Sequence, residues 1–173
     1  MELKVFGNSW GLACNFIHFL DLIDYFNDEL NYRLIKNNLS KIYKSKRKGF
    51  YDFYGALRFI TKKNTKIYFS SKMGRLSLKC VLIFKDNSYE IDMIKNHVIE
   101  KSLKSKKLSV RKNIIPFVSE QSGLFAKKIY KNNFNDLPTL KNSCKLHIPL
   151  IKIFCESFYR IKKIRKRNYC PIT

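Results

Sequence analysis

The stretch that most constrains the fold of this chain is residues 56–71, ALRFITKKNTKIYFSS. Its first half places Leu57 and Ile60 on one apolar side at helical spacing. After the polar break Lys-Lys-Asn, Ile67 and Phe69 alternate with more polar neighbours, which is the pattern of a half-buried strand. The stretch therefore predicts a basic helix that leads into a short strand, a unit that fits many folds and fixes no function.

A second stretch of the same kind covers residues 136–155. Asp136 can cap a helix that carries Pro138 in its first turn. Residues 147–155, HIPLIKIFC, follow as an apolar run of strand length. Two units in which a strand follows a helix predict an α/β fold.

The chain has 173 residues, enough for one domain with a real core, and 45% of them are hydrophobic. We expect a single α/β domain over residues 1–173, with an N-terminal helical segment at 1–40 and a basic C-terminal helix and tail at 156–173. Periodicity and turn residues predict the remaining elements. These are strands over 1–6, 80–84, 114–118 and 124–130, helices over 12–26 (capped by Ser9), 30–39, 72–79 and 88–103, and a basic loop over 104–112.

Charge is distributed unevenly along the chain. Residues 1–30 hold one base and five acids, whereas residues 31–173 hold 34 bases and eight acids, which together give the net charge of +22. Such repulsion destabilises a compact chain, and a polyanion that releases counterions on binding would relieve it. Nucleic acid is therefore the leading partner, with an anionic membrane surface as the alternative.

Three basic clusters are the candidate RNA-binding sites: the run KIYKSKRK at 41–48, the loop at 104–112 and the C-terminal helix. Aromatic residues flank the first cluster, as suits contact with RNA backbone and stacking on exposed bases. The predicted RNA-binding residues are Lys44, Lys46, Arg47, Lys48, Lys104, Lys106, Lys107, Arg111, Lys112, Arg160, Lys162, Lys163, Arg165, Lys166 and Arg167.

The sequence shows no pattern typical of catalysis or metal binding. The six glycines are scattered, the three histidines lie far apart, and the five cysteines form no Cys-x-x-Cys pair, so we expect reduced and mostly buried thiols. Glu90 and Asp92 could serve as two acidic ligands of a nuclease magnesium ion, but an i, i+2 pair diverges on the predicted helix. We therefore expect no catalytic residues, no metal and no cofactor.

Nothing in the sequence predicts a membrane span. The most apolar stretch, residues 10–26, is shorter than the roughly 20 residues that a span needs, and it contains two aspartates. The start MELKVFG has the features of neither a transit peptide nor a secretory signal. Heavy use of Lys, Asn, Ile, Phe and Tyr is the bias of an AT-rich genome, so we expect an organelle-encoded protein of the mitochondrial matrix.

Two stretches resemble the small-subunit ribosomal protein two family. Residues 41–72, KIYKSKRKGFYDFYGALRFITKKNTKIYFSSK, look like the family's segment in which a basic turn precedes a helix ending in Ala-Leu-x-Phe-Ile and a following strand. Residues 139–157, TLKNSCKLHIPLIKIFCES, are similar to its late helix and strand. The resemblance implies a reduced Rossmann-like sheet of mostly parallel strands with helices on both faces and basic extensions, docked on ribosomal RNA without catalysis.

Charge and resemblance together predict a structural constituent of the mitochondrial small ribosomal subunit. Such a protein would bind ribosomal RNA through the basic clusters and would contact neighbouring ribosomal proteins, with no enzymatic activity and no small-molecule substrate. Two other classes stay open: an accessory structural subunit of an organellar membrane complex, and a nucleic-acid-processing enzyme that would use Glu90 and Asp92.

Overall fold

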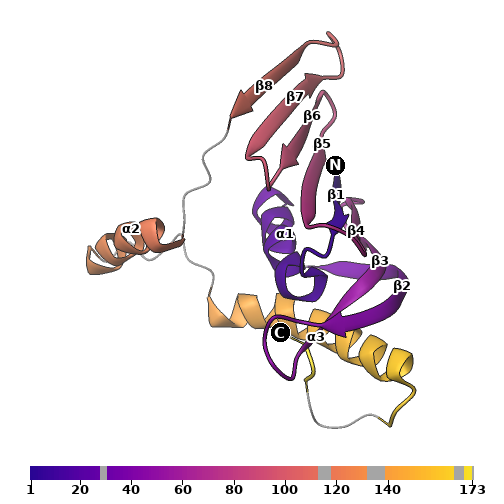
Figure 1. Cartoon of the computed structure of the whole chain (residues 1–173). Helices are drawn as coiled ribbons and strands as arrows, with labels where there is room; N and C mark the ends of the chain where they lie inside the picture. The colour runs from indigo at the N-terminus through magenta and orange to yellow at the C-terminus, as the bar shows by residue number, and fades with distance from the viewer. Residues whose placement is uncertain (28–30, 113–117, 132–138, 166–169, 173) are drawn as a thin grey trace.

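The computed structural model describes residues 1–27, 31–112, 118–131, 139–165 and 170–172 (Figure 1). Its strands are β1 (Glu2–Asn8), β2 (Tyr32–Lys44), β3 (Tyr51–Thr61), β4 (Lys66–Lys72), β5 (Ser77–Ile83), β6 (Asn87–Asp92), β7 (His97–Ser102) and β8 (Leu108–Lys112). Its helices are α1 (Leu12–Asn27), α2 (Val118–Tyr130) and α3 (Leu140–Lys162). The α/β class expected from the sequence is confirmed.

The eight strands form one sheet in the order β2-β3-β4-β1-β5-β6-β7-β8. Only β1 and β4 pair in parallel, and the other neighbouring pairs are antiparallel. The predicted sheet of mostly parallel strands is therefore wrong. Short turns can join antiparallel neighbours directly, whereas the parallel pair needs a long crossover, which here contains α1 and the β2–β3 hairpin.

The stretch predicted as a helix leading into a strand is in fact a hairpin of β3 and β4. In β3, Leu57 and Phe59 are buried and Arg58 between them is exposed, so the side chains repeat with a period of two. The polar break is the turn between the strands, where Asn64 has a φ of 60° and its N–H donates to the Thr61 carbonyl at 3.0 Å. The strand predicted after the break is confirmed as β4.

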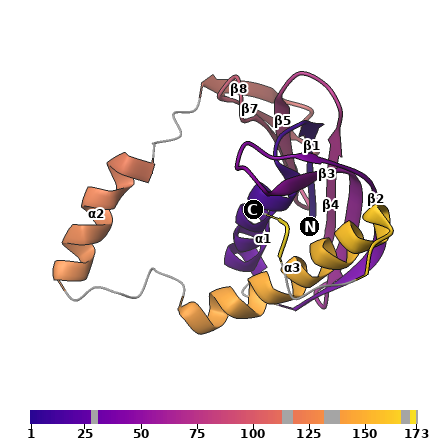
Figure 2. The same cartoon turned by 60° about the horizontal axis from the view of Figure 1, so that its bottom comes forward.

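The helices α1 and α3 cover the same face of the sheet, which gives the fold two layers (Figures 1 and 2). Aromatic rings join the layers: Phe16 of α1 lies 4.9 Å from Phe154 of α3 and 5.3 Å from Phe69 of β4, measured between ring centroids. Phe154 also packs on Phe53 of β3, with the ring centroids 5.3 Å apart. All four side chains are buried, so this cluster is the centre of the core.

The resemblance implied helices on both faces of the sheet, and the described residues do not show this arrangement. Figures 1 and 2 show α2 standing apart from the sheet and from the other two helices. Those of its residues whose side chains are described are exposed, apart from the half-buried Phe125. In the described ranges, no helix is long and apolar enough to cross a membrane.

The strand predicted at residues 147–155 is wrong, because these residues lie inside α3. Thr139 caps this helix, its hydroxyl accepting a hydrogen bond from the Asn142 N–H at 3.2 Å. Buried side chains then recur every three or four residues and form one apolar stripe. They are Leu146, Leu150, Phe154 and Phe158, and the neighbouring Ser157 and Tyr159 are buried as well. Pro149 cannot donate a backbone hydrogen bond, and the helix nevertheless continues through it.

Several other predictions can be compared with the structure. The strands predicted at 1–6 and 80–84 and the helix at 12–26 are confirmed. The helices predicted at 30–39, 72–79 and 88–103 are wrong, as is the strand predicted at 124–130, and residues 108–112 form a strand instead of a loop. Residues 114–117 and Asp136 lie outside the described residues, so the predictions made there stay predictions. Of the cysteines, Cys80 is buried, whereas Cys14 and Cys170 are exposed.

Candidate functional site

The face of the sheet opposite α1 and α3 carries polar and charged side chains. In β1, Leu3 and Val5 point towards the helices and are fully buried, whereas Lys4 and Phe6 point to the other side and reach solvent. We call this other side the open face. No described helix covers it, so side chains from neighbouring strands can meet a ligand there.

A hollow of about 440 Å³ lies on the open face at the end of β1, and we call it the β1 hollow. Strand register brings its residues together, because Phe6 pairs with both Ser70 of β4 and Lys79 of β5. The lining consists of Phe6, Gly7, Asn8, Tyr68, Ser70, Lys72, Ser77, Leu78, Lys79 and Asp92. Its volume is within the range of small-molecule sites, roughly 300–1,000 Å³.

A second hollow of about 280 Å³ adjoins the first, and we call it the charged hollow. It is lined by Lys79, Glu90, Asp92, Lys95, His97, Ile99 and Val110, from β5 to β8 and the β6–β7 turn. Lys79 and Asp92 line both hollows. The two hollows therefore adjoin each other on the open face, with two charged residues at their common boundary.

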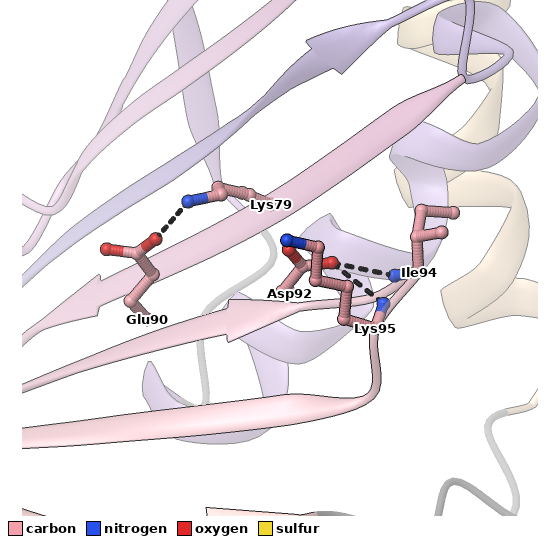
Figure 3. Close-up of polar contacts among 5 residues, drawn as sticks. All are labelled: Lys79, Glu90, Asp92, Ile94 and Lys95. Carbon is pink, nitrogen blue, oxygen red and sulfur yellow. Dashed lines mark hydrogen bonds and ion pairs between the residues drawn. The ribbon is translucent and has the colours of Figure 1, made fainter. Parts of the chain in front are cut away.

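Lys79 and Glu90 form an ion pair across β5 and β6, with Lys79 Nζ 2.5 Å from Glu90 Oε1 (Figure 3). The hydrogen bond to Glu90 raises the pKa of Lys79 above its usual value. The ammonium group is therefore charged at neutral pH, and an anionic ligand would compete with Glu90 for it. Both side chains are about two-fifths exposed, so a ligand can reach them from solvent.

Asp92 is held by the turn between β6 and β7 (Figure 3). Its Oδ1 accepts hydrogen bonds from the backbone N–H of Lys95 at 2.9 Å and of Ile94 at 3.1 Å. These bonds lower the pKa of Asp92, so it stays ionised at neutral pH. Since Lys79 stays protonated and Asp92 ionised, their geometry suits charge recognition better than proton transfer.

Glu90 and Asp92, the pair considered as ligands of a nuclease magnesium ion, lie on a strand and not on the predicted helix. Glu90 and Asp92 lie on one face of strand β6 and do not diverge around a helix. Each has another partner, however: Glu90 binds Lys79, and Asp92 binds two backbone N–H groups. Among the residues that the structure describes, no group of three or more His, Cys, Asp or Glu could hold a metal ion.

The predicted RNA-binding residues come from three segments of the chain, and none of those that the structure describes lines either hollow. The segments at the β2–β3 hairpin and at the end of α3 lie close together. Lys44, Lys46, Arg47 and Lys48 are at the β2–β3 hairpin, the second cluster is at the β7–β8 hairpin, and Arg160, Lys162, Lys163 and Arg165 are at the end of α3 and just beyond it. All of these are exposed. Lys166 and Arg167 lie outside the described residues.

Of the site residues of the open face, the sequence singles out Glu90 and Asp92 but not Lys79 or His97. Its pattern places Lys79 in a short basic helix and leaves His97 an isolated histidine. The available signal was the alternation in residues 77–83 and 88–92, which places Lys79, Glu90 and Asp92 on one side of adjacent strands. Pairing of β5 with β6 then brings them together.

The fold is shared with solved oxidoreductases and dehydrogenases. No protein-family model and no curated protein matches this chain, so the resemblance to the ribosomal family stays a prediction. Solved structures do match, at 8–14% identity, and the chain spans about half the length of those it matches. At this level of identity the likeness shows the fold alone.

Three of these structures illustrate the likeness. A dehydrogenase (MviM) from Clostridium difficile matches with a TM-score of 0.60 and 14% identity, over 89% of this chain and 54% of that one. UDP-N-acetylglucosamine 3-dehydrogenase GnnA from Acidithiobacillus ferrooxidans matches with a TM-score of 0.63 and 9% identity, over 88% of this chain and 52% of that one. A mutant of KijD10, a 3-ketoreductase from Actinomadura kijaniata, was solved in complex with TDP-benzene and NADP. It matches with a TM-score of 0.58 and 8% identity, over 86% of this chain and 49% of that one.

These matches contradict the predicted function. The predicted function as a ribosomal constituent, with ribosomal RNA and ribosomal proteins as partners, is wrong, because the solved chains that share this fold are oxidoreductases and dehydrogenases. The predictions that the chain is not an enzyme and has no small-molecule substrate are contradicted by the same finding. The predicted mitochondrial location is not tested by it.

The described residues do not fit a dinucleotide such as the NADP of the ketoreductase complex. Dinucleotides bind where a Gly-rich turn leads from a strand into a helix N-terminus of a parallel sheet. Here the corresponding turn is the one between β1 and α1, and the buried carboxylate of Asp52 already accepts the Ala13 N–H there, at 2.9 Å. A pyrophosphate at the same N–H would meet that carboxylate, so the turn is unsuitable for it.

Proposed function

We propose that this chain is the substrate-binding part of an oxidoreductase, and that its substrate is a small, hydroxyl-rich molecule with a phosphate group, such as a sugar nucleotide. The observation that carries the proposal is the β1 hollow on the open face. It combines the ammonium groups of Lys72 and Lys79, the carboxylate of Asp92, several neutral hydrogen-bonding side chains and the partly exposed rings of Phe6 and Tyr68 in a volume of about 440 Å³.

Each kind of side chain in the β1 hollow suits a part of such a molecule. Lys72 and Lys79 can pair with phosphate oxygens. The Asn8 amide and the Tyr68 hydroxyl can bond to sugar hydroxyls. Phe6 is 36% exposed and offers an apolar ring surface against which a sugar or base can pack. This mixture of a few polar groups around an apolar surface is typical of small-molecule sites.

The neighbours of this fold support the same class of substrate. One is a dehydrogenase of UDP-N-acetylglucosamine, and another was crystallised with a TDP compound. Both compounds are nucleoside diphosphates, the class for which two lysines beside an aromatic ring are suited. The proposal concerns substrate binding alone, because the described residues do not fit the dinucleotide that hydride transfer would need.

The test is calorimetric titration of the purified chain with UDP and with UDP-N-acetylglucosamine. The buffer should contain at least about 0.15 M salt, so that attraction by the net charge is screened. We expect saturable binding with one ligand per chain, weakened more than about tenfold by Lys79→Met, since a charge-assisted hydrogen bond contributes roughly 1.5–3 kcal/mol. Lys62→Met removes an equal charge from the β3–β4 turn, outside both hollows, and should leave binding unchanged.

Two results would overturn the proposal. The first is no saturable binding of either nucleotide, and the second is an equal loss of affinity in Lys79→Met and Lys62→Met. Circular dichroism of both variants establishes that they are folded. Phe6→Ala gives a second probe of the same hollow, since it removes the aromatic surface without changing charge, and it should also weaken binding.

A further inference from the structure

Two of the three predicted basic clusters converge in the structure. The β2–β3 hairpin lies against the end of α3: the rings of Tyr51 and Phe158 are 5.2 Å apart, and Lys162 Nζ is 5.2 Å from the centroid of the Tyr51 ring. Residues more than 110 positions apart in the sequence therefore build one basic surface. We call it the hairpin–helix surface, and it consists of Lys44, Lys46, Arg47, Lys48, Lys162 and Lys163.

Backbone hydrogen bonds fix the shape of the hairpin. The Ser45 N–H donates to the Phe50 carbonyl at 2.9 Å, the Phe50 N–H donates to the Arg47 carbonyl at 3.2 Å, and the Ser45 hydroxyl accepts from the Arg47 N–H at 3.1 Å. Gly49 takes a φ of 88°, which only glycine adopts without strain. The four basic side chains of the hairpin are exposed and extend from an ordered turn.

Arg160, predicted to bind RNA, also makes contacts within the chain. Its guanidinium donates to the Leu39 carbonyl at 3.1 Å and to Asn37 Oδ1 at 3.4 Å. Arg160 therefore joins α3 to β2 and holds the helix end beside the hairpin, and we assign it no direct contact with a partner. At the last turn, Lys163 adopts a left-handed conformation and its side chain is exposed.

No ion pair among the described residues balances the charge of the hairpin–helix surface. Residues 31–51 contain seven bases and no acid, and Glu156 is the one acid in α3. Within the described part of the chain, none of the six residues of this surface forms an ion pair with a carboxylate. At the β7–β8 hairpin, by contrast, Lys104 lies 2.9 Å from Asp86 and Arg111 lies 3.7 Å from Glu100. The two basic hairpins are therefore electrostatically different.

We infer that the hairpin–helix surface binds the phosphate backbone of a nucleic acid. Six like charges held close together repel one another, and a phosphate backbone relieves this repulsion while its condensed counterions are released. An anionic membrane is a poorer fit, because membrane-surface binding needs a whole apolar face, whereas Ile164, next to Lys163 and 50% exposed, is a single apolar side chain. The inference does not involve a ribosome. None of the six residues of the hairpin–helix surface lines the β1 hollow.

The test is fluorescence anisotropy of the full chain with a labelled 16-nucleotide RNA, repeated from about 50 to 200 mM salt. The variant is the triple charge reversal Lys46→Glu, Arg47→Glu and Lys48→Glu. The matched control is the reversal Lys104→Glu, Lys106→Glu and Lys107→Glu, which changes the net charge equally at the other hairpin. All six side chains are exposed, so both variants should fold, as circular dichroism will show.

We expect the first variant to lose more than about tenfold in affinity and to show a shallower salt dependence, because it neutralises fewer phosphates. The control should lose less than about threefold. Equal losses in the two variants would mean attraction by net charge alone and would overturn the inference. So would an unchanged affinity, or binding to vesicles containing phosphatidylserine in the absence of RNA binding. None of these outcomes bears on nucleotide binding in the β1 hollow, so the two proposals fail independently.

Discussion

The carboxylate of Asp52, in β3, accepts a hydrogen bond from the Ala13 N–H in the first turn of α1, with Asp52 Oδ1 2.9 Å from the Ala13 nitrogen. The same oxygen accepts the Phe53 N–H at 2.6 Å. Asp52 is only 2% exposed, so a buried side chain of the sheet caps the helix that covers it. This contact fixes the position of α1 and leaves the helix N-terminus unavailable to an anionic ligand.

Asp52→Ala should therefore destabilise the fold. The substitution leaves two backbone N–H groups without their acceptor in the interior, and each such loss costs roughly 1–3 kcal/mol. Urea unfolding followed by circular dichroism should show a loss of at least about 2 kcal/mol. Asp21→Ala, at an exposed position of α1, is the control and should change the unfolding free energy little. Equal effects of the two substitutions would show that the capping contact contributes nothing.

Asp52→Asn should change how stability depends on pH. Burial raises the pKa of Asp52 above its usual value of 3.8, although the backbone hydrogen bonds act in the opposite direction. The folded state therefore binds this proton more tightly than the unfolded state, and the wild-type chain loses stability as the pH rises from 3.8 through the folded-state pKa. The asparagine variant does not titrate, so its stability relative to wild type should increase over that interval. A constant difference between pH 3 and 7 would contradict the raised pKa.

Gly55→Ala should be strongly destabilising. Gly55 has a φ of 127°, and a Cβ atom added there would lie 2.3 Å from the Asn38 carbonyl oxygen of β2. Both the backbone conformation and the close approach of the strands exclude a side chain, so we expect a loss of more than about 2 kcal/mol in urea unfolding. Gly123→Ala, in α2, meets no atom within 4 Å and is the matched control. A tolerated Gly55→Ala would mean that β2 and β3 are not paired in this register.

Phe154→Ala should remove the contact between the helices and the sheet. The Phe154 ring packs on Phe16 and Phe53 and is 1% exposed, so its truncation should cost about 3–5 kcal/mol. Ile151→Ala, on the same helix but 41% exposed, should cost much less. Thermal unfolding of the two variants checks the difference. Similar values would indicate that α3 packs on the sheet through another side.

Lys79→Met should leave the fold nearly unchanged. The ion pair with Glu90 is about two-fifths exposed on both sides, and such pairs contribute roughly 0–1 kcal/mol. Urea unfolding should therefore show a change below about 1 kcal/mol, while nucleotide binding weakens more than about tenfold. If the unfolding free energy falls by more than about 2 kcal/mol, Lys79 is a structural residue. Weaker nucleotide binding by Lys79→Met would then reflect a damaged fold and would not support a ligand contact.

Some of the fold can be predicted from the sequence, because the apolar residues of certain segments fit only one kind of secondary structure. Residues 12–26 repeat apolar side chains at helical spacing, and residues 80–84 are a continuous apolar run, so α1 and β5 were identified correctly. Residues 88–103 fit two patterns at once: Ile91, Ile94 and Val98 suit a helix face, while Tyr89 and Ile91 also alternate as in a strand. The structure has the strand pattern, and the Asp92 side chain stabilises the turn after the strand by accepting the N–H groups of Ile94 and Lys95.

The β-branched residues of 147–155 explain the opposite error. They favour strands intrinsically, but the stripe from Leu146 to Phe158 has a longer period, and burial against the sheet outweighs local propensity. The candidate site was missed for a related reason. Lys79 and Asp92 become neighbours only through the pairing of β5 with β6, and a single sequence shows no pairing.

The most direct test of the proposed substrate site is nitrogen-15 chemical-shift mapping of the chain during titration with UDP. The account predicts that the largest shifts fall on the amides of Phe6, Asn8, Lys72 and Lys79, which line the β1 hollow. Amides of the β2–β3 hairpin should shift little at 0.15 M salt or above. Shifts confined to that hairpin, or no saturating shifts in the hollow, would contradict the account.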